Sequence, residues 1–225
     1  MPSPPISPPW RGRFISEPNF HESFREQLHD LFRWRRDVRG FTADPVPPVL
    51  LEHLLDLADL APSVGLSQPW RFVTVADPAR RQAVRDNFIH CNAQALSARD
   101  ADAGLYARLK LAGLDQAPCH LAVFCEPDPA QGRGLGRATM PETVIYSAVM
   151  AVHTLWLAAR AAGLGMGWVS ILDPVSVVAA LDVPTDWIFI GYFCLGTPSA
   201  PSAVPELERL GWEFRTQRQS RRLHR

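Results

Sequence analysis

The longest apolar stretch of the chain constrains its fold more than any other feature. Residues 144–162 are largely hydrophobic and are interrupted by His153, Thr154 and Arg160. These side chains make the stretch too polar for a lipid-exposed span of about 20 residues, so it predicts a buried helix, with His153 packed in the core. A helix that is apolar on nearly all faces needs more cover than one small domain supplies. We therefore expect a homodimer whose interface includes residues 143–163.

The overall composition is that of a globular protein. The chain has 225 residues, of which 47% are hydrophobic and 20% are charged. This suits one sizeable domain, or two small ones that share a core. The 23 basic and 23 acidic residues cancel, so no overall field attracts nucleic acid or an anionic membrane, and we expect neither as a partner. Only Lys110 is a lysine, so only clustered arginines count as evidence of a phosphate site.

The two ends of the chain differ from its middle. Residues 1–18 are rich in proline and lack an apolar segment, which predicts an extended arm and no secretory signal peptide. Residues 215–225 carry five arginines and no acid, which predicts a solvated tail, with a phosphate-reaching arm as the alternative. A single domain is expected over residues 19–214. The four cysteines have no CxxC spacing, so we expect reduced thiols, a cytoplasmic protein and no metal site.

Helix and strand patterns alternate along the domain. Helices are predicted over residues 21–33, 49–61, 78–90 and 144–162, with a short one after Asp173 and Pro174. Strands are predicted over residues 71–76, 120–125, 166–170 and 187–195. Residues 91–113 are rich in alanine and polar, and we interpret them as a mobile cover. The alternation predicts an α/β or α+β layered domain with a largely buried sheet.

Three arginines within five residues form the first candidate site. Arg35, Arg36 and Arg39 flank Asp37. Their guanidinium groups repel one another unless an anion or several acids compensate the charge, and guanidinium groups match phosphate oxygens in pairs. The cluster therefore predicts a phosphate site. The alternative is a solvated basic turn, which needs neighbouring acids, namely Asp30, Asp37 and Asp44.

Two further segments have the residue types of a ligand site. Residues 61–72, APSVGLSQPWRF, offer backbone N–H groups, hydroxyls and an amide to a planar polar ligand, although an ordinary helix-to-strand connection is the alternative. Residues 163–170, GLGMGWVS, contain glycines that let the backbone approach a flat ligand, and they end in Ser170. The chain has no GxGxxG, P-loop, GxSxG or HExxH motif. This disfavours Rossmann dehydrogenases, P-loop NTPases, standard serine hydrolases and zincins.

In combination these motifs carry a resemblance. The arginine cluster with Phe41, then APSVGLSQPWRF, the long apolar helix and GLGMGWVS resemble the nitroreductase-like flavoproteins over residues 32–195. Within them the chain resembles the BluB family of 5,6-dimethylbenzimidazole synthases, because Asp37 replaces a common serine and Leu66 replaces a common asparagine. The sequences YARLKL and MPET, at residues 106–111 and 140–143, are also similar to that family. The resemblance implies a nitroreductase-like α+β fold, with a central mixed, mainly antiparallel sheet flanked by helices, in a homodimer that binds FMN between its subunits.

The resemblance also implies an activity. Members of this family use O2 to fragment reduced FMN into 5,6-dimethylbenzimidazole, the lower ligand of cobalamin (vitamin B12), and erythrose 4-phosphate. FMN is then the substrate, O2 is the co-substrate, and a separate NAD(P)H-dependent flavin reductase supplies the reduced FMN. Two alternatives stay open. One is an NAD(P)H-dependent nitroreductase or flavin reductase in which FMN stays bound, and the other is a non-catalytic flavin-binding protein.

Carried over to this chain, the resemblance implies a set of flavin-binding residues. Arg35 and Arg36 would hold the FMN phosphate, and Arg39 would lie near the N1/O2 edge of the isoalloxazine. Three further residues would contact the flavin: Val38, Ser63 and Gln68. The last two would lie against the ring or the ribityl chain.

Two residues match the positions that the family uses in chemistry, and both would also contact the flavin. Asp37 would accept a proton when the ribityl chain breaks, which requires that the charge of the neighbouring arginines be taken up by the FMN phosphate. Ser170 would form a hydrogen bond at the reactive edge of the flavin. No metal and no protein nucleophile are needed, because the flavin carries the difficult chemistry.

Overall fold

The computed structural model describes residues 17–97, 111–216 and 221–223. Most of the predicted proline-rich arm, part of the basic tail and most of the predicted cover therefore lie outside the described residues. The predicted cover begins inside them, because the helix expected to end near residue 90 continues to Ser97. This continuation follows from its alanine-rich sequence, since alanine has the highest helix propensity.

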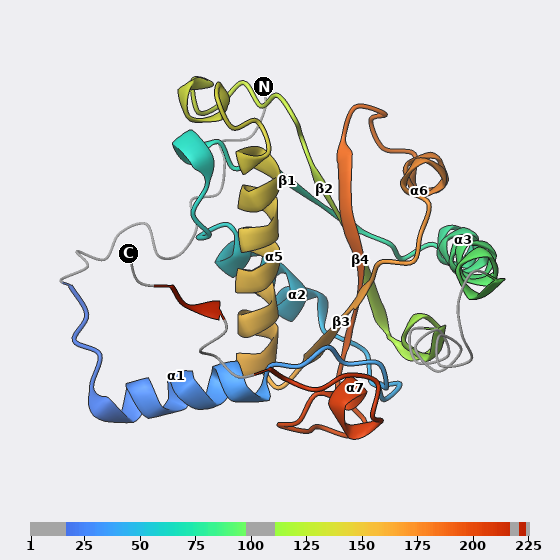
Figure 1. The fold of residues 1–225 in the computed structure, drawn as a ribbon, viewed down its shortest axis with the longest axis horizontal. Helices are drawn as coiled ribbons and strands as arrows, with labels where there is room; N and C mark the ends of the chain where they lie inside the picture. The colour runs from blue at the N-terminus through green and yellow to red at the C-terminus, as the bar shows by residue number, and fades with distance from the viewer. Residues whose placement is uncertain (1–16, 98–110, 217–220, 224–225) are drawn as a thin grey trace.

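A four-stranded sheet forms the centre of the molecule (Figure 1). Its strands are β1 (Trp70–Thr74), β2 (Cys119–Cys125), β3 (Gly165–Val169) and β4 (Ile188–Gly196), in the order β1-β2-β4-β3. The three strand pairings are all antiparallel, which confirms the mainly antiparallel sheet. Among the described residues, Asp37 forms an isolated parallel bridge with Met166 of β3.

Helices cover both faces of this sheet. On one face lie α2 (Pro48–Ala58) and α5 (Thr143–Ala161), and on the other lie α3 (Pro78–Ser97) and α6 (Pro174–Leu181). The residues of β2 alternate between the two layers, as the two-residue period of a strand requires. Those that face α2 and α5 are Leu121 and Val123, and those that face α3 and α6 are Ala122 and Phe124.

Smaller elements lie at the two ends of α5. The helix α1 (Glu22–Trp34), which has no buried residue, lies near the C-terminal end of α5. The helix α7 (Glu206–Arg209) also lies there, and it is part of residues 198–216, which we call the C-terminal segment. The short 3-10 helices η1 (Val64–Leu66) and η2 (Leu135–Arg137) pack near the N-terminal end of α5 (Figure 1). Residues 111–116 are also helical.

The helix α5 is the central helix of one layer. By length and composition alone it is apolar enough to cross a membrane. In the structure it packs against the sheet through a buried stripe that includes Val152, Leu155 and Ala159, which confirms the predicted core helix. His153 falls outside this stripe and is exposed, so the prediction that it packs in the core is wrong. The helical period of 3.6 residues places position 153 on the face turned away from the sheet.

Candidate functional site

Residues 35–39, which we call the arginine segment, run from the end of α1 along the edge of the sheet. Arg35 leaves the helix in an extended conformation. The backbone N–H of Val38 then donates a hydrogen bond to the carbonyl of Met166 in β3, at 3.0 Å. Residues 35–39 are therefore held against β3 by backbone contacts.

The glycines of the GLGMGWVS segment make this contact with β3 possible. A Cβ atom at Gly167 would lie 2.0 Å from the carbonyl oxygen of Val38, and one at Gly165 would lie 2.7 Å from Val38 Cγ2. Neither position has room for a side chain. The prediction that these glycines face a flat ligand is therefore wrong for Gly165 and Gly167, because they face the chain's own residue 38.

Arg35 is partly buried without an anionic partner of its own. Its guanidinium carbon lies 5.1 Å from the centre of the Trp156 ring. Within the described part of the chain, its side chain forms no hydrogen bond and no ion pair within 4 Å. Burial lowers the pKa of Arg35, the charge of Asp37 opposes this shift, and the charge of Arg215 adds to it.

Arg36 donates hydrogen bonds to backbone carbonyl groups. Its Nε and Nη2 donate hydrogen bonds to the carbonyl of Ala203 at 2.9 and 2.6 Å. Burial lowers its pKa first, the charges of Arg215, Arg35 and Arg33 lower it further, and the charge of Glu208 opposes these shifts. Backbone carbonyls orient this guanidinium group, which forms no ion pair within 4 Å among the described residues.

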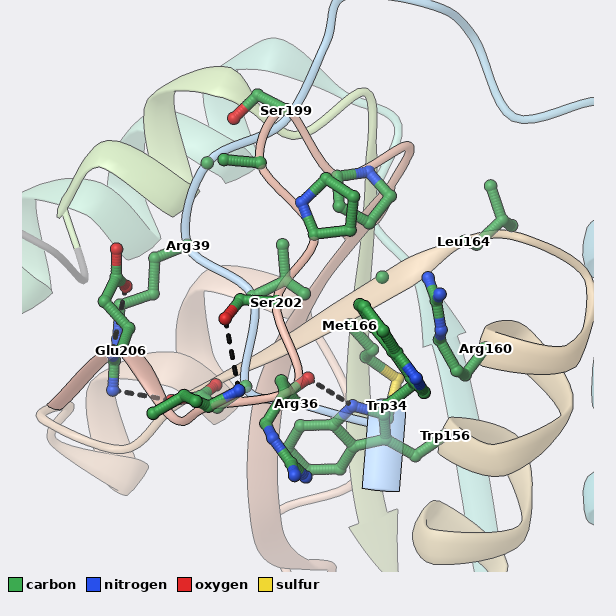
Figure 2. Close-up of a pocket in the computed structure, with 18 of the residues that line it drawn as sticks. Trp34, Arg36, Arg39, Trp156, Arg160, Leu164, Met166, Ser199, Ser202 and Glu206 are labelled. Carbon is green, nitrogen blue, oxygen red and sulfur yellow. Dashed lines mark hydrogen bonds and ion pairs between the residues drawn. The ribbon is translucent and has the colours of Figure 1, made fainter. Parts of the chain in front are cut away.

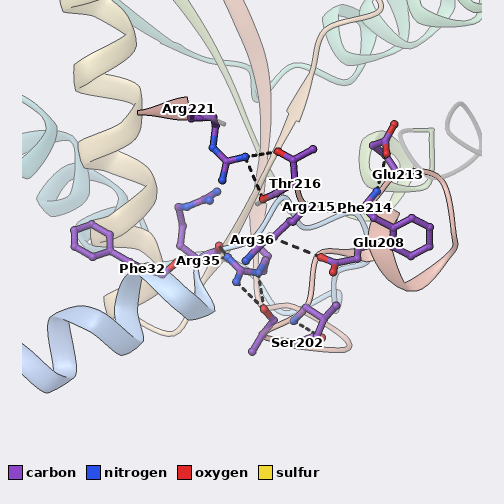
Figure 3. A network of polar contacts seen from close by, with 12 residues as sticks. Phe32, Arg35, Arg36, Ser202, Glu208, Glu213, Phe214, Arg215, Thr216 and Arg221 are labelled. Carbon is purple, nitrogen blue, oxygen red and sulfur yellow. Dashed lines mark hydrogen bonds and ion pairs between the residues drawn. The ribbon is translucent and has the colours of Figure 1, made fainter. Parts of the chain in front are cut away.

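These side chains surround a surface pocket that we call the arginine pocket. Its described lining residues are His29, Phe32, Arg33, Arg35, Arg36 and Arg215. Figure 3 shows four of them: Phe32, Arg35, Arg36 and Arg215. Among the residues that the structure describes, none in this lining is acidic, although Glu208 lies 3.7 Å from Arg215. Arg215 comes from the segment that the sequence assigned to a solvated tail. The positive lining and the lowered arginine pKa values indicate a site for an anion.

The alternative of a turn neutralised by nearby acids matches the contacts of Arg39 but not those of Arg35 and Arg36 within the described residues. Asp30 lies 3.8 Å from His29, and Asp44 accepts a hydrogen bond from the Thr42 hydroxyl at 2.7 Å. Across residues 17–97, 111–216 and 221–223, neither carboxylate pairs with an arginine of the cluster. Asp37 does form such a pair, but with Arg39 and outside the arginine pocket.

Arg39 lies in the protein between two carboxylates. Its side chain is 4% exposed and donates to Asp37 at 2.8 Å and to Glu206 of α7 at 3.1 Å. The second oxygen of Asp37 accepts the backbone N–H of Trp168 at 2.9 Å. The Asp37 side chain is 30% exposed, so this carboxylate lies at the boundary between the buried arginine and solvent. Sequence reasoning missed Glu206, because no local pattern connects it with a residue so far away in the chain.

A cavity of about 90 Å³ lies on the inner side of this segment (Figure 2). It is bounded by residues 34–40, by the C-terminal end of α5 and by residues 198–209. The C-terminal segment therefore packs over the arginine segment and supplies both the Ala203 carbonyl and the Glu206 carboxylate.

Ser170 lies at the end of the strand that holds Asp37. It directly follows β3 and is exposed. Trp168, whose backbone binds Asp37, precedes it by two residues, which is about 7 Å along an extended strand. The structure therefore brings the two candidate catalytic residues to the same end of β3.

The Ser63–Gln68 loop lies elsewhere in the chain. The Ser63 hydroxyl accepts the backbone N–H of Gln68 at 3.1 Å, and Gln68 has a positive φ of 43°. The backbone N–H of Val64 donates to the Ser147 hydroxyl on α5 at 3.0 Å. These contacts fix the loop at the N-terminal end of α5.

The arginine segment lies near the other end of the same helix. The indole N–H of Trp156 donates to the carbonyl of Arg36 at 3.2 Å. Trp156 and Ser147 are nine residues apart, which is about 14 Å along the axis of an α-helix. The structure therefore does not bring Ser63 and Gln68 of one chain to the arginine pocket of that same chain (Figure 1).

The cysteines and metal-binding residue types form no further site in the described ranges. Cys119, Cys125 and Cys194 are buried, and no cysteine forms a disulfide, in agreement with the predicted reduced thiols. Burial raises the pKa of Cys119 and raises that of Cys125 to about 11, so both stay protonated thiols at neutral pH. Among the described residues, no group of three or more His, Cys, Asp or Glu side chains is arranged to hold a metal ion.

Comparison with known proteins finds a matching family model, similar sequences and similar structures. The model of the nitroreductase family matches residues 32–197. A 5,6-dimethylbenzimidazole synthase from Rhodospirillum rubrum is 59% identical over 88% of this chain and 94% of its own length, and one from Rhodobacter capsulatus is 49% identical over 87% and 95%. The crystal structure of oxidized iodotyrosine deiodinase bound to FMN and 3-iodo-L-tyrosine is 26% identical, with a TM-score of 0.66 over 78% of this chain and 91% of that one.

Proposed function

The chain belongs to the nitroreductase family and, within it, to the 5,6-dimethylbenzimidazole synthases, and on that premise we propose that it uses O2 to fragment reduced FMN into 5,6-dimethylbenzimidazole and erythrose 4-phosphate. The observation that carries the proposal is the arginine pocket beside Asp37. It combines an anion site with a carboxylate that borders solvent, as a phosphorylated substrate that must lose protons requires.

The arginine pocket fits the phosphate of FMN. Arg35 and Arg36 are partly desolvated, and each has a lowered pKa in part because of the charge of Arg215. A phosphate dianion supplies the missing negative charge and accepts hydrogen bonds from several guanidinium groups at once. The phosphate leaves the reaction on erythrose 4-phosphate, so the same arginines bind substrate and product.

The remaining chemistry needs proton transfer and orientation from the protein. Reduced FMN itself supplies the reactivity toward O2, so the chain needs neither a nucleophile nor a metal. Asp37 acts as the proton acceptor, and because Arg39 also pairs with Glu206, Asp37 is not the only carboxylate that neutralises this cation. Ser170 forms a hydrogen bond at the reactive edge of the ring.

A second copy of the chain would complete the site. The arginine pocket and the Ser63–Gln68 loop lie at opposite ends of α5, so we propose that the loop of one protomer closes over the arginine pocket of its partner. Two surfaces are available for this association. They are the exposed face of α5, with Tyr146 and Met150, and the unburied helix α1, with Phe24 and Phe32.

Complementation between inactive variants tests the shared site. Arg35→Ala and Gln68→Ala each disable one half of a site, so each homodimer loses activity. A mixed dimer of the two contains one doubly altered site and one intact site. Recovery of activity after mixing and subunit exchange supports the shared site, while no recovery from verified mixed dimers contradicts it. A stable monomer with bound FMN in sedimentation experiments also contradicts it.

A single assay tests the function itself. The pure protein is incubated with FMN, NADH, a separate flavin reductase and O2, and both 5,6-dimethylbenzimidazole and flavin are quantified. We expect formation of dimethylbenzimidazole together with loss of flavin, and no oxidation of NADH when the reductase is omitted. NAD(P)H oxidation with full retention of FMN would instead indicate a nitroreductase or flavin reductase. Binding without either reaction would indicate a flavin-binding protein. A cytoplasmic location stays a prediction based on the reduced thiols.

A further inference from the structure

We propose that Trp156 is a positioning residue that holds Arg35 and Arg36 ready for the phosphate, an inference that rests on the proposed assignment of the arginine pocket to FMN. Trp156 contacts both arginines in different ways. The Arg35 guanidinium lies over its ring at 5.1 Å, and its indole N–H donates to the Arg36 carbonyl at 3.2 Å. One side chain of α5 therefore fixes two consecutive residues of the phosphate site.

The ring of Trp156 is itself firmly held. It is 8% exposed and belongs to the core between α5 and the sheet. Its centre lies 6.5 Å from that of Trp168 and 6.4 Å from that of Phe193, so it sits in a cluster of three aromatic rings. A packed aromatic ring offers a fixed face to the guanidinium group.

Arg35 depends on this face because the described part of the protein gives its side chain no hydrogen bond and no ion pair. A long arginine side chain that is otherwise unrestrained loses rotamer freedom when it binds an anion. The contact with the Trp156 ring restricts the position of the guanidinium group before the phosphate arrives. The contact with the ring face uses no N–H donor in a hydrogen bond, so these donors stay available for phosphate oxygens.

The contact with Arg36 acts through the backbone. The Arg36 guanidinium is oriented by Ala203, whereas its carbonyl is bound by Trp156. Loss of the indole N–H would free the peptide bond that joins residues 36 and 37. Trp156 thereby couples the phosphate site to the segment that carries Asp37.

Binding of oxidised FMN and of riboflavin, measured by flavin fluorescence without turnover, separates positioning from general packing. We expect Trp156→Leu to weaken FMN binding about tenfold, because it removes both a cation–π contact and a hydrogen bond. Riboflavin, which lacks the phosphate, should change less than twofold. Trp156→Phe keeps a ring and should recover part of the FMN affinity, with a loss of about threefold.

Trp187 provides a matched control on the opposite face of the sheet. Its ring lies 6.0 Å from the Arg71 guanidinium and packs near Phe124, so it resembles Trp156 in its contacts but lies outside the arginine pocket. Trp187→Leu should leave the ratio of FMN to riboflavin affinity unchanged. Thermal unfolding of each variant shows whether it is folded. If Trp156→Leu does not fold, Trp156→Phe alone decides the question.

Arg35→Ala distinguishes failure of this inference from failure of the proposed function. A selective loss of FMN binding in Arg35→Ala, without one in the Trp156 variants, overturns the positioning role and keeps the phosphate site. An equal loss of riboflavin and FMN binding in the Trp156 variants makes Trp156 structural. An equal loss of both ligands in Arg35→Ala overturns the phosphate assignment and the inference with it.

Discussion

Two groups of polar side chains in this protein differ in how far the chain itself supplies their hydrogen-bond and ion-pair partners. In the core, His120 Nδ1 lies 2.9 Å from the Tyr192 hydroxyl, and His120 Nε2 lies 3.2 Å from the Ala117 carbonyl. Because the carbonyl can only accept, Nε2 carries the proton and Nδ1 accepts from Tyr192. Both ring nitrogens are therefore satisfied within the chain. In the arginine pocket, Arg35 has no comparable partner among the described residues.

The difference separates polar groups that serve the fold from those that serve a ligand. Buried polar groups are stable when their hydrogen bonds are complete, as they are for His120 and Tyr192. Cations that are partly desolvated and close to one another destabilise the unliganded protein, unless an anion compensates them. Under the proposed function, the phosphate of FMN supplies the charge that the arginine pocket needs. Asp37, which follows Arg36 in the chain but lies outside the lining of that pocket, has partners on both oxygens and is still partly exposed.

Replacement of Asp37 should have the largest effect on activity, because it removes the proposed proton acceptor next to the arginine pocket. Asp37→Asn keeps the size of the side chain, and dimethylbenzimidazole formation should fall by about 10²- to 10⁴-fold, the usual loss for a general base. Oxidised FMN and hydrogen peroxide should form instead. The measurement is dimethylbenzimidazole formed per FMN consumed in a single turnover. Asp44→Asn, a nearby aspartate bound to Thr42, is the control, and an unchanged rate in Asp37→Asn would exclude Asp37 as the base.

The sequence predicts the parts of the site that are contiguous. RRDVR and APSVGLSQPWRF stand out because their unusual residues are neighbours in the chain, and most helices and strands follow from local periodicity. The partners of these segments come from far away. Trp156, Glu206 and Arg215 meet the arginine segment only through the packing of α5 and the C-terminal segment, and no local pattern indicates such contacts.

Two sequence interpretations were wrong for a related reason. The glycine pattern predicts that Gly165 and Gly167 approach a ligand, but both lie against Val38. Such a pattern indicates that other atoms come close to the backbone, and it does not indicate which atoms these are. His153 was expected in the core because its helix is apolar on most faces. The exposed face of α5 is itself apolar, with Tyr146 and Met150, so composition alone did not reveal which side packs against the sheet.

A second prediction concerns the effect of acid on stability through the buried pair of His120 and Tyr192. Burial lowers the pKa of His120 to about 4, the charge of Arg81 lowers it too, and the hydrogen bond to Ala117 opposes the shift. The unfolded chain, with an ordinary pKa near 6.5, then binds more protons than the folded chain between pH 6.5 and about 4. Stability is therefore lost as the pH falls through this range, by roughly 3 kcal/mol for complete protonation.

The measurement is the free energy of unfolding in urea at several pH values between 7.5 and 4.5. His120→Gln removes the titrating group, so its stability should vary less with pH than that of the wild type. His53→Gln replaces an exposed histidine on α2 and should keep the wild-type slope. If His120→Gln retains the full acid sensitivity, the buried pair is not its source.

A third prediction concerns Arg35 and Arg36, which form no ion pair within 4 Å among the described residues. Arg35→Ala and Arg36→Ala should each weaken FMN binding by about 1.5 to 3 kcal/mol, the size of a charge-assisted contact, and should affect riboflavin little. Because these cations repel one another in the free protein, neither replacement should lower the stability of the unliganded protein by that amount. Calorimetric titration with both flavins and thermal unfolding without ligand measure the two effects. A large loss of unliganded stability would place these arginines with His120, as residues that serve the fold.

The smallest effect is expected at Arg215, the contribution of the C-terminal segment to the arginine pocket. Its side chain is 63% exposed and lies 3.7 Å from Glu208, so water and salt screen its charge. Arg215→Ala should weaken FMN binding by only ~0.5 kcal/mol at low ionic strength, and the loss should vanish in high salt. Arg221→Ala removes an arginine that bonds Thr216 outside the pocket lining, and it should have no such effect. A salt-resistant loss as large as that of Arg35→Ala would instead make Arg215 a primary phosphate ligand. The tail would then be the phosphate-reaching arm that the sequence analysis gives as the alternative. The phosphate site would then include the C-terminal segment as well as Arg35 and Arg36.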